Sequence, residues 1–102
     1  MACFLAEWYR TELTENAISS FASLLESSAE AMSIEAAPVR LLVTLSVPAD
    51  DALYGVFEAE TSESILRTCT RVGALPHRLT PQVQTLIANG LRGHDPWSDE
   101  GE

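Results

Sequence analysis

The amino-acid sequence predicts a single α+β domain whose strands and helices follow the order β-α-β-β-α-β. Two observations carry this prediction. Apolar residues recur at helical spacing in one long and one short stretch, and four runs rich in β-branched and aromatic residues flank those stretches. The chain has 102 residues, a usual size for one domain. We expect the domain over residues 1–90 and an acidic, flexible C-terminal tail over 91–102.

Four segments have the character of strands. Residues 3–9 (CFLAEWY) alternate loosely, and residues 39–47 (VRLLVTLSV) form the most β-rich run of the chain. A PADD turn joins that run to residues 53–60 (LYGVFEAE), which predicts a hairpin. The last strand is expected over residues 79–87 (LTPQVQTLI), and Pro81 indicates an edge position because proline cannot donate to a ladder.

Two segments have the character of helices. The first begins after the N-cap candidate Thr14 and extends for about 18 residues, since one apolar stripe runs through it. This stripe comprises Ile18, Phe21, Ala22, Leu25, Ala29 and Met32. The second helix is short, is capped by Thr61 or Ser62, and is expected to end at Gly73, a residue type that suits the left-handed position after a helix.

This order of elements is typical of the split βαβ, or ferredoxin-like, fold. Its antiparallel four-stranded sheet has the strand order 4-1-3-2 and carries both helices on one face. Strict alternation places these residues on the helix-covered face: Phe4, Ala6, Leu41, Val43, Leu45, Gly55 and Phe57. The opposite, open face is expected to carry Leu5, Glu7, Tyr9, Arg40, Leu42, Thr44, Tyr54, Val56 and Glu58.

The open face mixes apolar side chains, tyrosines and charges. Monomers rarely leave a large apolar patch uncovered. We therefore expect a homodimer in which two sheets pack face to face with two-fold symmetry, as in a dimeric α/β barrel. Such a dimer would enclose a cavity between the two sheets.

Composition excludes several classes of partner. The net charge of −9 repels phosphate backbones and anionic headgroups, so neither nucleic acid nor a membrane surface is an expected partner. No apolar run approaches the roughly 20 residues that span a bilayer. The first residues carry no basic segment of the signal-peptide type, and two cysteines suit a reducing compartment, so a cytoplasmic location is expected.

Glu7 and Glu58 are the leading pair of candidate site residues. Both are expected on the two central strands of the open face, with Arg40 on the same side. Two neighbouring carboxylates in a cavity would raise the pKa of one of them, which suits acid/base chemistry or metal binding. The alternative is that they line the dimer interface and that Arg40 pairs with one of them.

Cys69 and His77 are weaker candidates. Cys69 lies on the apolar stripe of the second helix and is expected to pack inward as a small hydrophobe. His77 lies in the loop before the last strand, where it is either a general base at a cavity mouth or a solvated histidine. Their spacing matches no zinc motif, and we assign no metal ligands. The glycine-rich and GxSxG motifs of nucleotide-binding and hydrolytic enzymes are absent.

The sequence therefore favours a small-molecule ligand held in the cavity of a homodimer, with no resident cofactor. The residues expected to contact the ligand are Glu7, Tyr9, Arg40, Tyr54, Glu58 and His77. One alternative is a cofactor-independent enzyme of the isomerase or monooxygenase type, with Glu58 or His77 as its base. A transition-metal-binding protein is the other alternative, and catalysis stays open.

Residues 53–83 also resemble a family. The strand residues Val56, Phe57, Glu58 and Ala59, the cap Thr61, and then Gly73 and Pro76, together with Glu7 in the first strand, are similar to small bacterial proteins of unknown function grouped with a nickel-binding protein. The resemblance extends over residues 2–87 and implies a ferredoxin-like fold, a dimer, and nickel as an alternative ligand. Its metal-binding members supply histidines where this chain has Tyr9, Arg10 and Cys69.

Overall fold

A computed structural model describes residues 2–84 of the chain and has the expected order of elements. The elements are β1 (Ala2–Tyr9), α1 (Glu15–Glu35), β2 (Val39–Val47), the 3-10 turn η1 (Pro48–Asp50), β3 (Ala52–Ala59), α2 (Ser62–Arg71) and β4 (Arg78–Thr80). The tail expected over residues 91–102 lies outside the described residues. Among the described residues, no helix is long and apolar enough to cross a bilayer.

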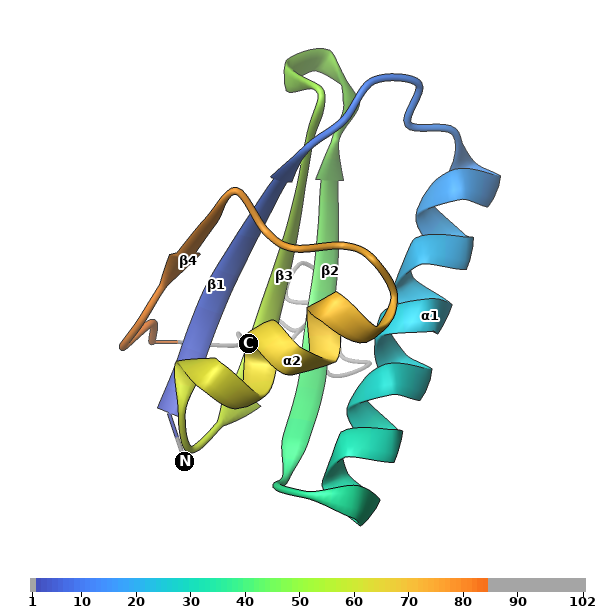
Figure 1. Ribbon diagram of the computed structural model, residues 1–102. Coiled ribbons are helices and arrows are strands. Elements are labelled where there is room, and N and C mark those ends of the chain that lie inside the picture. Colours follow the sequence, from blue (N-terminus) through green and yellow to red (C-terminus); the bar gives the residue numbers. More distant parts are fainter. Residues whose placement is uncertain (1, 85–102) are drawn as a thin grey trace, which may run out of the picture.

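The four strands form one antiparallel sheet of order β2-β3-β1-β4, which confirms the ferredoxin-like arrangement. Figure 1 shows α1 and α2 on the same side of this sheet, with α1 beside β2 and α2 crossing in front of the central strands. Among residues 2–84, no helix lies on the other side of the sheet. We call the two sides the helix face and the open face.

Helix α1 begins where its sequence predicts and continues a turn further than expected. The hydroxyl oxygen of Thr14 accepts a hydrogen bond from the Ala17 amide at 3.1 Å, which satisfies one of the unpaired amides of the first turn. At the other end, Ser33 Oγ accepts from the Val39 amide and donates to the Val39 carbonyl, both at 3.0 Å. This double contact ties the end of α1 to the beginning of β2.

Helix α2 begins and ends with local signals that the sequence displays. Thr61 is its N-cap and accepts from the Ser64 amide at 3.3 Å. Gly73 has a φ of 68°, the left-handed conformation that glycine adopts without strain. The Ala74 amide then donates to the Cys69 carbonyl at 2.9 Å, which satisfies a carbonyl of the last turn.

Trp8 is the largest side chain of the core on the helix face. It is 1% exposed, and its ring meets that of Phe21 edge-on with centroids 4.9 Å apart. Its indole Nε1 donates to the Ala74 carbonyl at 2.8 Å, so the polar group of this buried side chain is satisfied. Gly55 lies beneath the ring, because a Cβ there would stand 3.1 Å from Trp8 Cζ3. A side chain at position 55 would therefore require the indole to shift by a few tenths of an ångström.

A β-bulge in β2 overturns part of the predicted alternation. Leu41 pairs with Phe57 on the helix face, and the next pair along the strands is Val43 with Val56. Leu42 is therefore the extra residue of β2, with no partner of its own on β3. Beyond the bulge every side chain of β2 lies on the face opposite to the predicted one. Val43 and Leu45 therefore belong to the open face. Thr44, expected there, pairs with Gly55 on the helix face.

The last strand is shorter than predicted. β4 comprises Arg78–Thr80 instead of residues 79–87. It ends before Pro81, which has no amide to donate, and Gln82 then has a φ of 57°, which is incompatible with extended pairing. The Val83 amide still donates to the Cys3 carbonyl at 2.9 Å, so the chain stays beside β1 after the strand ends. The remainder of the predicted strand, residues 85–87, lies outside the described residues.

The fit of Trp8 over Gly55 predicts a coupled effect on stability. Gly55→Ala forces a methyl group against the indole, and such overpacking costs about 1–3 kcal/mol of the free energy of unfolding. Urea unfolding followed by circular dichroism measures the cost. In a Trp8→Phe background the contacting ring atoms are absent, so the same substitution is expected to cost less. Equal costs in the two backgrounds would show that the crowding lies elsewhere.

Candidate functional site

Cross-strand register arranges the open-face side chains in four rows. Paired residues of an antiparallel sheet project from the same face, so each row can be read across the strands. From the beginning of β1 to its end, the rows are Arg40–Glu58–Cys3, Val43–Val56–Leu5–Thr80, Leu45–Tyr54–Glu7–Arg78 and Val47–Ala52–Tyr9. An apolar row thus separates two rows that contain charges.

The β2 edge of the open face is apolar and uncovered in the single chain. Leu45 is 53% exposed and Val43 is 41% exposed, and both stand beside the open-face residues of β3. Sequence alternation assigned both side chains to the core. The bulge instead places Val43 in one row with Val56 and Leu5; Val56 is only 7% exposed, so the exposed apolar surface is the strip along β2.

Glu7 and Glu58 lie on the open face as predicted, but in different rows. Glu58 stands opposite Cys3, four positions along β1 from Glu7, so about 13 Å of strand separates the two carboxylates. Each has an arginine of its own: Arg40 Nη1 lies 3.7 Å from Glu58 Oε1, and Arg78 Nε lies 3.9 Å from Glu7 Oε2. The two acids therefore do not form a pair that shares a proton, and Arg40 pairs with Glu58 as the alternative interpretation proposed.

Four residues gather around the end of β1, and we call them the Glu7 cluster: Glu7, Tyr9, His77 and Arg78. The Tyr9 hydroxyl donates to Glu7 Oε1 at 2.8 Å. This hydrogen bond, together with the negative charge of Glu7, raises the pKa of Tyr9 above its ordinary value of 10.0. The Glu7 side chain is only 12% exposed, and its two oxygens face Tyr9 and Arg78.

The backbone of β1 orients His77. The His77 amide donates to the Glu7 carbonyl at 2.7 Å, and the Tyr9 amide donates to His77 Nδ1 at 3.4 Å. The imidazole meets the Tyr9 ring edge-on with centroids 5.3 Å apart. Because Nδ1 accepts a hydrogen bond, we assign the proton of the neutral ring to Nε2. In this tautomer His77 offers its remaining nitrogen as a donor, which argues against the predicted role of general base.

Tyr54 and Arg78 complete the row that contains Glu7. Tyr54 stands opposite Glu7 on β3, and no hydrogen bond links its hydroxyl to another residue in the part of the chain that the structure describes. Arg78 is not among the residues predicted to form the site, because the sequence pattern places the beginning of the last strand one residue later. An arginine beside a histidine just before an edge strand was the available signal, and pairing with Glu7 became apparent only from the register.

Cys69 packs inward, as the sequence predicts. Its side chain is fully buried in the core beneath α2, and burial raises the pKa of its thiol to about 12. A thiol of this kind is neither a nucleophile nor a metal ligand at neutral pH. Over residues 2–84, no three side chains of histidine, cysteine, aspartate or glutamate come close enough together to hold a metal ion.

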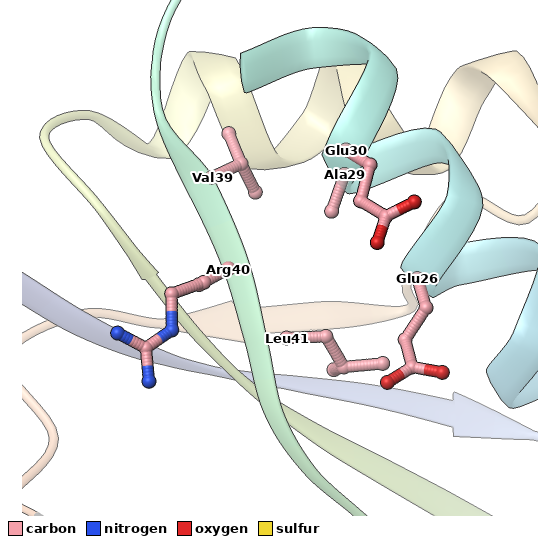
Figure 2. A pocket seen from close by; sticks show the side chains of 6 residues that line it. All are labelled: Glu26, Ala29, Glu30, Val39, Arg40 and Leu41. Carbon is pink, nitrogen blue, oxygen red and sulfur yellow. The ribbon is translucent and has the colours of Figure 1, made fainter. Parts of the chain in front are cut away.

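Two hollows lie on the helix side of the molecule, away from the open face. One of about 110 Å³ lies between α1 and β2, and Figure 2 shows Leu41 and Val39 turned toward α1 while Arg40 points to the other side of the strand. The other, of about 290 Å³, lies between the two helices, with Met32, Arg67, Thr70 and Arg71 around it. Of the predicted site residues, only Arg40 borders either of these two hollows, and its side chain points away from the hollow.

Comparison with known proteins supports the fold. No protein-family model and no curated protein matches the sequence. Among solved structures, the chain resembles the crystal structure of SCO4226 from Streptomyces coelicolor A3(2), with a TM-score of 0.72 over 84% of this chain and 100% of that chain. The two sequences are 15% identical, so the likeness shows a shared fold.

The Tyr9–Glu7 hydrogen bond predicts an altered titration of the phenol. Glu7→Gln removes the negative charge that opposes the phenolate, so the pKa of Tyr9 is expected to fall toward 10.0. Ring carbon chemical shifts of labelled tyrosine, followed by NMR against pH, measure this change. The matched control is Glu58→Gln, whose carboxylate stands three rows from Tyr9 and should leave the Tyr9 titration unchanged. Identical titrations in both variants would contradict the contact.

Burial of Cys69 predicts that its thiol is protected in the native protein. In a Cys3→Ser variant, a disulfide reagent at pH 8 should label Cys69 only as fast as the protein opens, because very little thiolate forms when the pKa is about 12. Absorbance of the released thiol measures the rate. The same variant in guanidinium chloride is the control and should react within the mixing time of the assay. Comparable rates in both solutions would show that the thiol is accessible.

Proposed function

We propose that the protein is a homodimer whose two open faces pack together and hold a small organic ligand between them. The observation that carries this proposal is the exposed apolar strip that the bulge creates on β2, where Val43 and Leu45 stand on the open face. Burial of such a surface is the dominant favourable contribution to protein association. The helices already cover the other face, so the open face is the side of the sheet left for a partner.

Charge balance favours a second copy of the chain as that partner. The protein carries a net charge of −9, which opposes self-association in general. On the open face, however, the glutamates Glu7 and Glu58 are matched by the arginines Arg40 and Arg78. Helix α1, in contrast, contains Glu15, Glu26, Glu30 and Glu35 and no arginine. Two copies can therefore approach through the open face with little repulsion.

The dimensions of the sheet give the area of the open face that is available to a partner. Strands rise about 3.3 Å per residue and lie about 4.8 Å apart, so three long strands and the short β4 give a face of roughly 400 Å² in projection. Side chains add relief to this area. The projected area is about half of the roughly 800 Å² that each partner buries in a standard interface, so the proposed interface is a small one.

A ligand between the two sheets would contact both the apolar rows and the polar residues around them. The expected ligand residues Glu7, Tyr9, Tyr54 and His77 all lie at the end of the sheet where β1 ends. Arg40 and Glu58 lie at the opposite end of the open face. The proposed binding site therefore centres on the Glu7 cluster and Tyr54.

Binding is proposed in preference to catalysis because both expected bases are engaged. Glu58 faces Arg40, and the Nδ1 atom of His77 accepts the Tyr9 amide. The nickel alternative is the weaker one, because Cys69 is buried with a raised pKa. We place the proposed dimer in the cytoplasm, since Cys3 and Cys69 are free thiols and a reducing compartment suits them.

The proposed interface predicts that one substitution on β2 strongly weakens the dimer. Leu45→Glu would bury an unpaired carboxylate between the sheets, and an uncompensated buried charge costs about 3–5 kcal/mol. The dissociation constant of the dimer should therefore rise by about 100-fold or more. Sedimentation equilibrium over a micromolar concentration range measures this constant.

Leu24→Glu is the matched control. Leu24 lies on α1 and is 54% exposed, close to the 53% of Leu45, but it belongs to the helix side. It should leave the association constant unchanged. A wild-type protein that sediments as a monomer at micromolar concentration would refute the proposal, as would equal effects of the two substitutions.

A further inference from the structure

We propose that the ligand is an apolar molecule that ends in a hydrogen-bond-accepting oxygen, a carbonyl or a carboxylate, and that this oxygen binds at Tyr54, His77 and Arg78. The inference deepens the proposed function and rests on it, because the site lies on the face that the dimer would enclose. It follows from the hydrogen-bonding capacity that the Glu7 cluster leaves unused.

The acceptors of the Glu7 cluster already face partners. Glu7 Oε1 accepts the Tyr9 hydroxyl at 2.8 Å, and Glu7 Oε2 faces Arg78 Nε at 3.9 Å. His77 Nδ1, the acceptor nitrogen of the neutral ring, receives the Tyr9 amide at 3.4 Å. A ligand that offered only donors would have to share these acceptors with their present partners, and an ammonium group would also stand beside the positive charge of Arg78. The arrangement therefore disfavours an amine or ammonium ligand.

The donors around the same carboxylate remain available. Arg78 is 71% exposed and contacts Glu7 through Nε, which leaves the N–H groups of both terminal nitrogens for another acceptor. Nε2 of His77 carries the proton of the neutral ring. The Tyr54 hydroxyl stands opposite Glu7 on the neighbouring strand and has no partner among the described side chains. The Tyr54 hydroxyl can donate or accept, but the Arg78 guanidinium and Nε2 of His77 only donate, so an acceptor oxygen suits the unused capacity best.

Apolar side chains adjoin these donors on the same face. Leu45 flanks Tyr54 in its row, and the next row brings Val43, Val56 and Leu5. A ligand whose oxygen reaches the donors would extend its remaining atoms over this apolar surface. Binding would then combine burial of apolar area with oriented hydrogen bonds, the usual composition of a small-molecule site.

The net charge of the cluster admits either kind of oxygen. Glu7 and Arg78 cancel, so neither a neutral carbonyl nor a carboxylate meets a net like charge at this end of the sheet. The negative charge of the remainder of the chain acts over a longer distance and is screened beyond about 8 Å at physiological salt. Three naphthalene probes therefore test the inference: 2-naphthoate, 2-acetylnaphthalene and 2-naphthylmethylamine.

The experiment titrates each probe into the full-length protein at 0.15 M salt and follows backbone and side-chain chemical shifts by NMR. Naphthoate or acetylnaphthalene is expected to bind with shifts at Tyr9, Tyr54 and His77, whereas the amine is expected to bind at least 10-fold more weakly. Preference for naphthoate over the ketone would identify a carboxylate ligand, and the reverse preference would identify a carbonyl. A preference for the amine, or no shifts with any probe, would overturn the inference.

Variants separate the donors from the apolar surface. Arg78→Met is expected to weaken naphthoate binding about 10-fold, because it removes a charge-assisted hydrogen bond but keeps the aliphatic stem. Tyr54→Phe should weaken binding of both oxygen-bearing probes about 5-fold. Arg67→Met, which removes an arginine from α2 on the helix side, is the control and should have no effect. An unchanged affinity in both Arg78→Met and Tyr54→Phe would overturn the assignment.

Sedimentation of the same samples tests the face-to-face dimer separately from the class of ligand. A protein that is monomeric with and without probe refutes the face-to-face dimer and, with it, the enclosed site. A dimer that prefers the amine refutes only the ligand class and leaves the dimer proposal intact. Each result therefore decides between the specific and the general claim.

Discussion

A single extra residue in β2 determines the character of the open face. The register moves from Leu41–Phe57 to Val43–Val56, and every side chain of β2 beyond that point changes sides. Val43 and Leu45 would otherwise belong to the core, and the open face would present Thr44 in their place. The apolar surface, the proposed interface and the apolar part of the proposed ligand site all depend on this bulge.

The helix face tolerates the bulge because its core does not rely on the second half of β2. Trp8 occupies the space above Gly55, meets Phe21 edge-on and donates to the Ala74 carbonyl. One large side chain thus connects β1, α1 and the loop after α2. The two faces of the sheet therefore differ: the helix face packs around the indole of Trp8, and the open face carries the proposed interface.

Chemistry on the open face concentrates where β1 ends. Tyr9 and Glu7 lie two residues apart on one strand, so they project from the same face and their side chains can meet in a hydrogen bond of 2.8 Å. His77 and Arg78 come from the loop and edge strand that pair with the same part of β1. Three of these four residues, Glu7, Tyr9 and His77, are predicted site residues, as is Tyr54 on the neighbouring strand. The prediction that Glu7 acts together with Glu58 is wrong, because four positions along β1 separate the two carboxylates.

The sequence by itself determined the elements, their order, the helix caps and the inward position of Cys69, because these features depend on local propensity and on periodicity within one segment. Tertiary structure alone decided the faces of Val43 and Leu45, the separation of Glu7 from Glu58, and the contact of Arg78 with Glu7. Each of these depends on the register between strands. Register is a property of paired backbones, and one inserted residue changes it without a clear signal in the chain.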